Sequence, residues 1–184
     1  VGEEEREGWN ALLRQIGAAE QKEIHARKVL EALAAAQECL ATRALSSALA
    51  HVAVAKDAMV MSGTEEVYGK DVRDVETKIA FALAQESASQ NIKDCIRAGE
   101  AALELSRAPG KRGKVVEARS SLDQGLALLP ELPEGERAAL LAEVQLLQSG
   151  VEAAERWVLG CEEGERALTA GREALLQGKV REAG

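Results

Sequence analysis

Helix breakers are so rare in this chain that long α-helices are the main structure open to it. The only prolines are Pro109, Pro130 and Pro133, so helix-forming runs extend over long stretches without interruption. Ala, Leu, Glu, Gln, Lys and Arg, which are the strongest helix formers, dominate these runs. The sequence therefore predicts an all-α protein.

The remaining turn signals divide the chain into pieces of very unequal length. Ser62-Gly63, the loop composition of Arg107 to Gly113 and the segment from Pro130 to Pro133 each end a helix. The predicted helices cover residues 3–42, 46–61, 65–106, 114–129 and 135–177, and a sixth begins at 179–183. We expect one all-helical, repeat-like domain over residues 1–184: an elongated array of helical hairpins with alternating long (about 40-residue) and short (about 16-residue) helices. The short last piece predicts a fragment that is truncated at its C-terminus.

Helix length raises a packing problem, because a short helix can cover only part of a long one. Each short helix is expected to run back along the C-terminal half of the long helix before it. The N-terminal halves of the long helices then have no obvious local partner. Residues 132–163 are open to two interpretations: one continuous helix, which we favour, or a degenerate hairpin that turns at Ser149-Gly150.

Small residues recur where the hairpins are predicted to cross. The two clearest clusters are Ala170-Gly171-Arg-Glu-Ala174-Leu175, followed by Gly178 and Ala183, and Ala98-Gly99-Glu-Ala-Ala102-Leu103. Small residues at helical spacing predict helices that pack closely, and we expect Gly171 to lie at such a crossing. The pattern resembles the tetratricopeptide repeat, although the family's aromatic residues are missing and the matched units are not contiguous. The resemblance implies a protein–protein interaction scaffold, whereas unrelated helical-bundle packing accounts for the same small residues.

Charge and cysteine content narrow the classes of partner. The formal net charge of −8 argues against a nucleic-acid partner, because phosphate binding depends on Lys and Arg. Cys39, Cys95 and Cys161 lie too far apart for a dense disulfide framework or for paired zinc ligands. Reduced thiols, and hence a cytoplasmic location, are expected. No apolar run approaches the ~18 residues of a membrane-spanning helix, so no membrane partner is expected.

The polar residues form no recognisable catalytic or metal-binding motif. His25 and His51 are isolated, and spacing suggests no third ligand for either. The run from Gly110 to Lys114 has the glycines of a phosphate-binding loop but lacks the hydroxyl residue after its lysine, and it follows a helix instead of a strand. We therefore expect no enzyme activity, no cofactor, no metal and no small-molecule substrate.

Two surfaces are candidates for binding a partner. The first is the loop whose four positive charges lie close together in an acidic chain: Arg107, Lys111, Arg112 and Lys114. This loop either docks an acidic peptide or tail, or is merely solvated. The second is a heptad-like apolar stripe that contains Leu140, Val144, Leu147 and Val151.

The apolar stripe has counterparts in the two earlier long helices. Their apolar residues are Trp9, Leu12, Leu13, Ile16 and Ala19 in the first, and Val72, Val75, Ile79 and Ala82 in the second. Either a partner covers these stripes, or they meet one another inside one bundle. The sequence thus favours a non-enzymatic scaffold that binds another protein or another copy of itself. The alternative is a structural, self-assembling helical rod or coiled-coil element.

Overall fold

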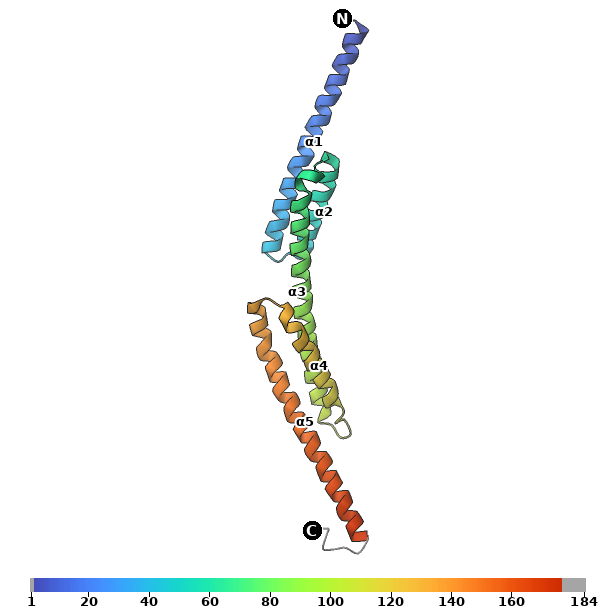
Figure 1. Ribbon diagram of the computed structural model, residues 1–184, viewed down its shortest axis with the longest axis vertical. Coiled ribbons are helices and arrows are strands. Elements are labelled where there is room, and N and C mark those ends of the chain that lie inside the picture. The colour runs from blue at the N-terminus through green and yellow to red at the C-terminus, as the bar shows by residue number, and fades with distance from the viewer. Residues whose placement is uncertain (1, 177–184) are drawn as a thin grey trace. The chain divides into compact units, whose positions relative to one another are not determined.

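The computed structural model describes residues 2–176, and these residues are almost entirely α-helical, without any strand (Figure 1). The elements are α1 (Glu3–Ala41), α2 (Leu45–Ser62), α3 (Glu65–Ser106), α4 (Lys114–Leu128), the 3-10 turn η1 (Leu129–Glu131) and α5 (Glu134–Leu176). The all-α prediction is confirmed. The predicted helix at 179–183, with Gly178 and Ala183, lies outside the described residues.

The chain divides into two compact units, residues 1–84 and 85–184. The boundary between the units falls within the bounds of α3. Each unit has its own hydrophobic cluster, and each cluster draws on a long helix, a short helix and the next long helix. We call the two units unit 1 and unit 2.

The core of unit 1 joins the C-terminal part of α1, the whole of α2 and the N-terminal part of α3. Ala36 in α1 and Ala48 and Ala55 in α2 are completely buried. Side chains this small allow the two helices of the hairpin to approach closely. Larger residues, among them Val52 and Ile79, fill the space that faces α3.

The core of unit 2 is built from the corresponding parts of the chain: the C-terminal part of α3, the helix α4 and the N-terminal part of α5. In this unit α3 and α5 approach closely, and each helix presents a glycine to a leucine of the other. A Cβ added to Gly99 would lie 2.7 Å from Cδ2 of Leu147, and one added to Gly150 would lie 3.0 Å from Cδ1 of Leu103. Both glycines therefore serve as notches that receive a leucine side chain.

Backbone conformation and local hydrogen bonds define where the helices of each unit begin and end. In unit 1, α2 stops at Gly63, whose φ of 68° lies in the left-handed region that glycine tolerates best. The buried hydroxyl of Ser62 donates a hydrogen bond to the carbonyl of Ala58 at 2.9 Å. In unit 2, the guanidinium of Arg137 donates to the carbonyl of Leu132 at 2.9 Å, which ties the start of α5 to the turn before it.

The structure corrects one packing expectation and resolves another. The N-terminal parts of α3 and α5 do not lack local partners, because Val72 and Val144 are buried in the cores of units 1 and 2. The short helix covers the long helix that follows it as well as the one before. Residues 134–176 form one helix, as we favoured, and Gly150 within it is a packing notch instead of a turn.

Gly99→Ala should lower the stability of unit 2, whereas Gly125→Ala should raise it. Alanine gains up to about 1 kcal/mol of helix propensity over glycine at either position. At Gly125 the new methyl would meet Cβ of Cys95 at 3.5 Å, an ordinary contact. At Gly99 it would collide with Leu147, which is buried and not free to move, so overpacking of about 1–3 kcal/mol outweighs the gain. Thermal unfolding followed by circular dichroism measures both; equal effects would show that the notch is not tight.

Candidate interaction surfaces

The basic loop between α3 and α4 is anchored to α5 within unit 2. Nη1 of Arg112 lies 2.8 Å from Oε1 of Glu165, and the guanidinium sits over the ring of Trp157, 5.8 Å from its centroid. The hydrogen bond to Glu165 raises the pKa of Arg112 further above its usual value. Arg112 is therefore occupied with its own chain.

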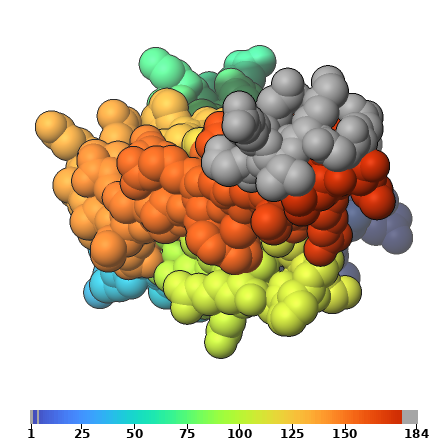
Figure 2. All heavy atoms as spheres, turned by 90° about the horizontal axis from the view of Figure 1, so that it is seen from below, coloured from blue at the N-terminus to red at the C-terminus, as the bar shows by residue number. Residues whose placement is uncertain are grey.

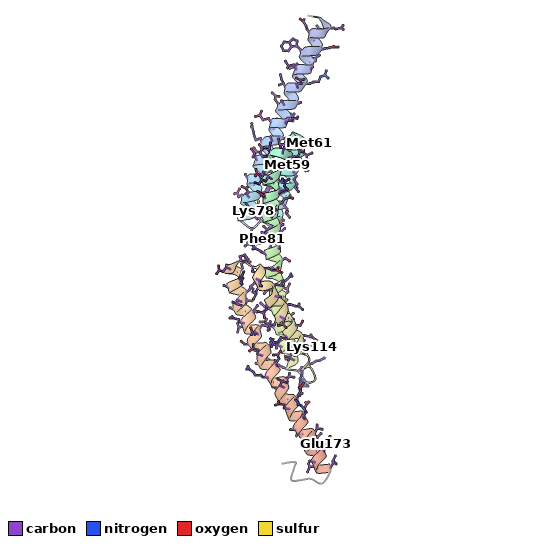
Figure 3. All side chains as sticks on the ribbon, viewed as in Figure 1. Met59, Met61, Lys78, Phe81, Lys114 and Glu173 are labelled. Carbon is purple, nitrogen blue, oxygen red and sulfur yellow. The ribbon has the colours of Figure 1, made fainter. Side chains whose placement is uncertain are left out.

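The other three cations of the loop divide into one paired and two unpaired. Nζ of Lys114 forms an ion pair with Glu117 one turn along α4, and Figure 3 labels this lysine beside the loop. Arg107 and Lys111 make no ion pair with any residue between 2 and 176. Two of the four charges, rather than four, are thus available to an acidic partner.

A pocket of about 480 Å³ lies beside Arg107 in unit 2. Its lining residues are Leu103, Ser106, Arg107, Gly150, Ala153, Ala154 and Trp157. The residues that α5 contributes to the lining include three small ones, Gly150, Ala153 and Ala154. The pocket therefore places apolar walls next to a guanidinium that has no acidic partner among the described residues.

The apolar stripe of α5 lies inside unit 2. Leu140, Val144, Leu147 and Val151 all belong to the unit's core and are at most 4% exposed. Side chains of α3 and α4 cover them. Of the two interpretations that the sequence left open, burial among the chain's own helices describes these four residues, and they form no surface for a partner.

The N-terminal half of α1, unlike the buried stripe of α5, exposes apolar side chains to solvent. Trp9 is 64% exposed, and Leu12 and Leu13 are also exposed. Figure 1 shows this part of α1 extending beyond α2, and no residue of α1 before Val29 is in the unit 1 core. A contiguous apolar surface of this kind usually marks an interface.

A bidentate ion pair connects α4 to α5. Nε and Nη2 of Arg119 donate to the two carboxylate oxygens of Glu155 at 2.9 and 2.6 Å. The hydrogen bonds from Arg119 lower the pKa of Glu155, and they raise the pKa of Arg119. The sequence did not predict this ion pair, because the two residues are far apart in the chain and nothing in the local pattern of either helix indicates a partner on the other.

Other features of the described residues bear on chemistry. Among residues 2–176, the His, Cys, Asp and Glu side chains form no group of three or more that is suited to hold a metal ion. The three cysteines are free thiols and half-buried. Within the same residues, no helix has both the length and the apolar character that crossing a membrane requires.

Comparisons with family models, with curated proteins and with solved structures find no match. The resemblance to the tetratricopeptide repeat therefore depends on the small residues at the hairpin crossings alone.

Val144→Glu should unfold unit 2 instead of merely removing a partner. Val144 is 1% exposed, and a carboxylate without a partner in an apolar core costs several kcal/mol. Leu146→Glu is the matched control, because Leu146 is two residues away on α5 and is 75% exposed. Circular dichroism should show a large loss of helix for the first variant and little change for the second. Retention of the full helix signal by Val144→Glu would contradict the assignment of the stripe to the core.

Arg119→Met should lower the free energy of unfolding by about 0.5–1 kcal/mol at neutral pH, the upper range for an ion pair that is partly exposed to solvent. Because folding lowers the pKa of Glu155, the pair's contribution is complete above the usual carboxylate pKa of about 4.3 and disappears as the pH falls through the lower, folded value. Urea unfolding of wild type, Arg119→Met, Glu155→Gln and the double variant at several pH values measures this coupling. Coupling that persisted in strong acid would exclude an ionic origin.

Proposed function

We propose that the chain is a non-enzymatic protein-interaction scaffold, an array of tetratricopeptide-like hairpins in which long and short helices alternate, acting in the cytoplasm. The observation that supports this proposal is that unit 2 repeats the core of unit 1 position by position. Repeat proteins stack such units and act through the surfaces that the stacking presents.

The repetition is clearest in the two short helices. Leu45, Ala48, Val52 and Ala55 of α2 are buried, and so are Val115, Ala118, Leu122 and Gly125 of α4. The spacings are identical, and a small residue stands at the same place in each hairpin. The buried residues of the long helices follow the same rule, with Val29, Leu33 and Ala36 in α1 matched by Ile92, Ile96 and Gly99 in α3.

The surface of unit 2 that best suits a partner is the pocket beside Arg107. Its apolar lining, which includes Trp157, accommodates an aliphatic or aromatic side chain. Arg107 and Lys111 supply the positive charge that an acidic neighbour of that side chain would pair with. The occupant that fits is an acidic peptide segment with one apolar anchor residue.

A second candidate function, a self-assembling helical element, is favoured by one observation. The N-terminal half of α1 exposes apolar residues to solvent, among them Trp9 and Ile16. Removing apolar surface from water is favourable by about 25 cal/mol per Å². Association between copies is one way of burying it.

Capture from a cell lysate with three forms of the purified chain tests the scaffold proposal. The forms are wild type, Arg107→Glu with Lys111→Glu, and a control, Lys93→Glu with Arg97→Glu, which reverses two exposed charges on α3 away from the pocket. We expect mass spectrometry to identify proteins that wild type and control retain and that the loop variant loses, because reversed charge repels an acidic partner. The same proteins on all three forms, or none on any, would argue against this surface.

A further inference from the structure

Both ends of the described chain carry a half-helix that lies outside the core of its unit. The N-terminal half of α1 exposes Trp9, Leu12 and Ile16, and the C-terminal part of α5 exposes Leu168 and Leu175. Figure 2 looks onto the C-terminal half of α5, in red, and shows it at the surface of unit 2. We call these surfaces the α1 end face and the α5 end face.

In each unit, we call the long helix before the short one the first helix and the long helix after it the last helix. The α1 end face has the apolar pattern of a last helix. Trp9, Leu12 and Ile16 have the spacing of Val72, Val75 and Ile79, which α3 buries in unit 1. They have equally the spacing of Val144, Leu147 and Val151, which α5 buries in unit 2. The distance along the chain from Trp9 to Ala36 equals that from Val72 to Gly99 and that from Val144 to Gly171.

The α5 end face has the pattern of the first helix of a unit. Leu168, Gly171 and Leu175 have the spacing of Ile96, Gly99 and Leu103 in α3, and of Leu33, Ala36 and Leu40 in α1. Those earlier residues pack within units 2 and 1. The α5 end face is therefore a first helix whose last helix is not provided by any described residue.

The contact that the two end faces are shaped to make already exists in unit 2. There, Leu147 of the last helix occupies the notch at Gly99 of the first helix. By the register above, Leu12 corresponds to Leu147, and Gly171 corresponds to Gly99. The prediction of a close helix crossing at Gly171 is wrong for the described residues, because an added Cβ there would have no described atom within 4 Å. The notch at Gly171 is therefore open, and Leu12 is 45% exposed.

We infer that copies of the chain associate with one another: the α5 end face of one copy packs against the α1 end face of another, with Leu12 in the notch at Gly171. This inference rests on the proposed function, in that it takes the units to be stacking repeats. The contact has the register of the one that the chain already makes between two long helices in each unit.

The two end faces differ from one another, so their contact is heterologous. Each copy keeps one unused face after pairing, and further copies add head to tail unless the arrangement closes into a ring. In unit 2, the atoms nearest to a Cβ added at Gly99 all belong to Leu147, so the contact between the two long helices is direct.

Apolar burial, not charge, drives this association. Residues 3–24 and residues 152–176 each contain six acidic and three basic residues, so the two segments repel one another weakly. Salt screens that repulsion. Association should therefore be unchanged or stronger as the salt concentration rises, the opposite of what an association through ion pairs would show.

Sedimentation velocity on the purified full chain tests the inference. The average mass of wild type should rise with protein concentration beyond that of a dimer. Leu12→Glu and Gly171→Leu should each weaken association at least tenfold, the first by placing a charge in the interface and the second by filling the notch. Both positions are outside the unit cores, so circular dichroism should show an unchanged helix content.

Two neighbouring substitutions serve as matched controls. Ala11→Glu adds the same charge to α1, at an exposed position where α3 carries the exposed Asp74 in the folded unit 1. Thr169→Leu adds the same side chain to α5, at a position where α3 carries the exposed Arg97. Both variants should associate as wild type does.

A mixture of Leu12→Glu and Gly171→Leu identifies the geometry. Each variant retains one intact end face, the α5 face in the first and the α1 face in the second. Mixed in equal amounts, they should form a heterodimer and nothing larger. The inference is overturned if wild type stays monomeric at every concentration, if the controls weaken association as strongly, or if the mixture does not dimerise. None of these results bears on capture of other proteins at the Arg107 pocket, which would still test the scaffold proposal.

Discussion

The arrangement of both cores follows from a mismatch in helix length. The short helices, with 18 and 15 residues, are less than half as long as the long ones, with 39, 42 and 43. At 1.5 Å per residue, a short helix cannot bury the apolar face of a long helix over its whole length. The solution is that one long helix serves two cores. Val72, Val75 and Ile79 of α3 belong to unit 1, and Ile92 and Ile96 belong to unit 2.

The mismatch also explains where glycine and alanine are needed. The first and last helices of a unit run beside the same short helix, so they approach one another as well. In unit 2 this approach is close enough that Leu147 requires a glycine opposite it, at position 99, and Leu103 requires one at position 150. In unit 1 the place of Gly99 is taken by Ala36, which is completely buried. The small residues are thus a consequence of packing two long helices beside one short helix.

Much of the fold could be predicted because the residues at the ends of the helices determine where those helices begin and end. Gly63 and the Pro130 to Pro133 segment are turn signals that need no tertiary context, and α2, α4 and α5 begin and end within one residue of the predicted positions. The partners of each face could not be predicted in the same way. The stripe at Val144 has the appearance of an exposed seam until α3 and α4 are placed over it, and Gly150 has the appearance of a turn until Leu103 fills it. The basic loop is similar: its charges are visible in the sequence, but the contact between Arg112 and Glu165 spans 53 residues.

The position of the unit boundary inside a helix affects how such a chain changes in evolution. Domain boundaries usually lie in flexible linkers, where recombination does least damage. Here the repeat matches position by position along the long helices, so Lys22 and Gln85 are equivalent. A deletion that joins residue 21 to residue 85 removes one short helix and leaves a single long helix whose apolar residues keep their phase, with Ala19 as far from Ile92 as it now is from Val29. Recombination between equivalent points in mid-helix therefore adds or removes whole units, and the joined residues still form one continuous helix with its apolar residues in phase.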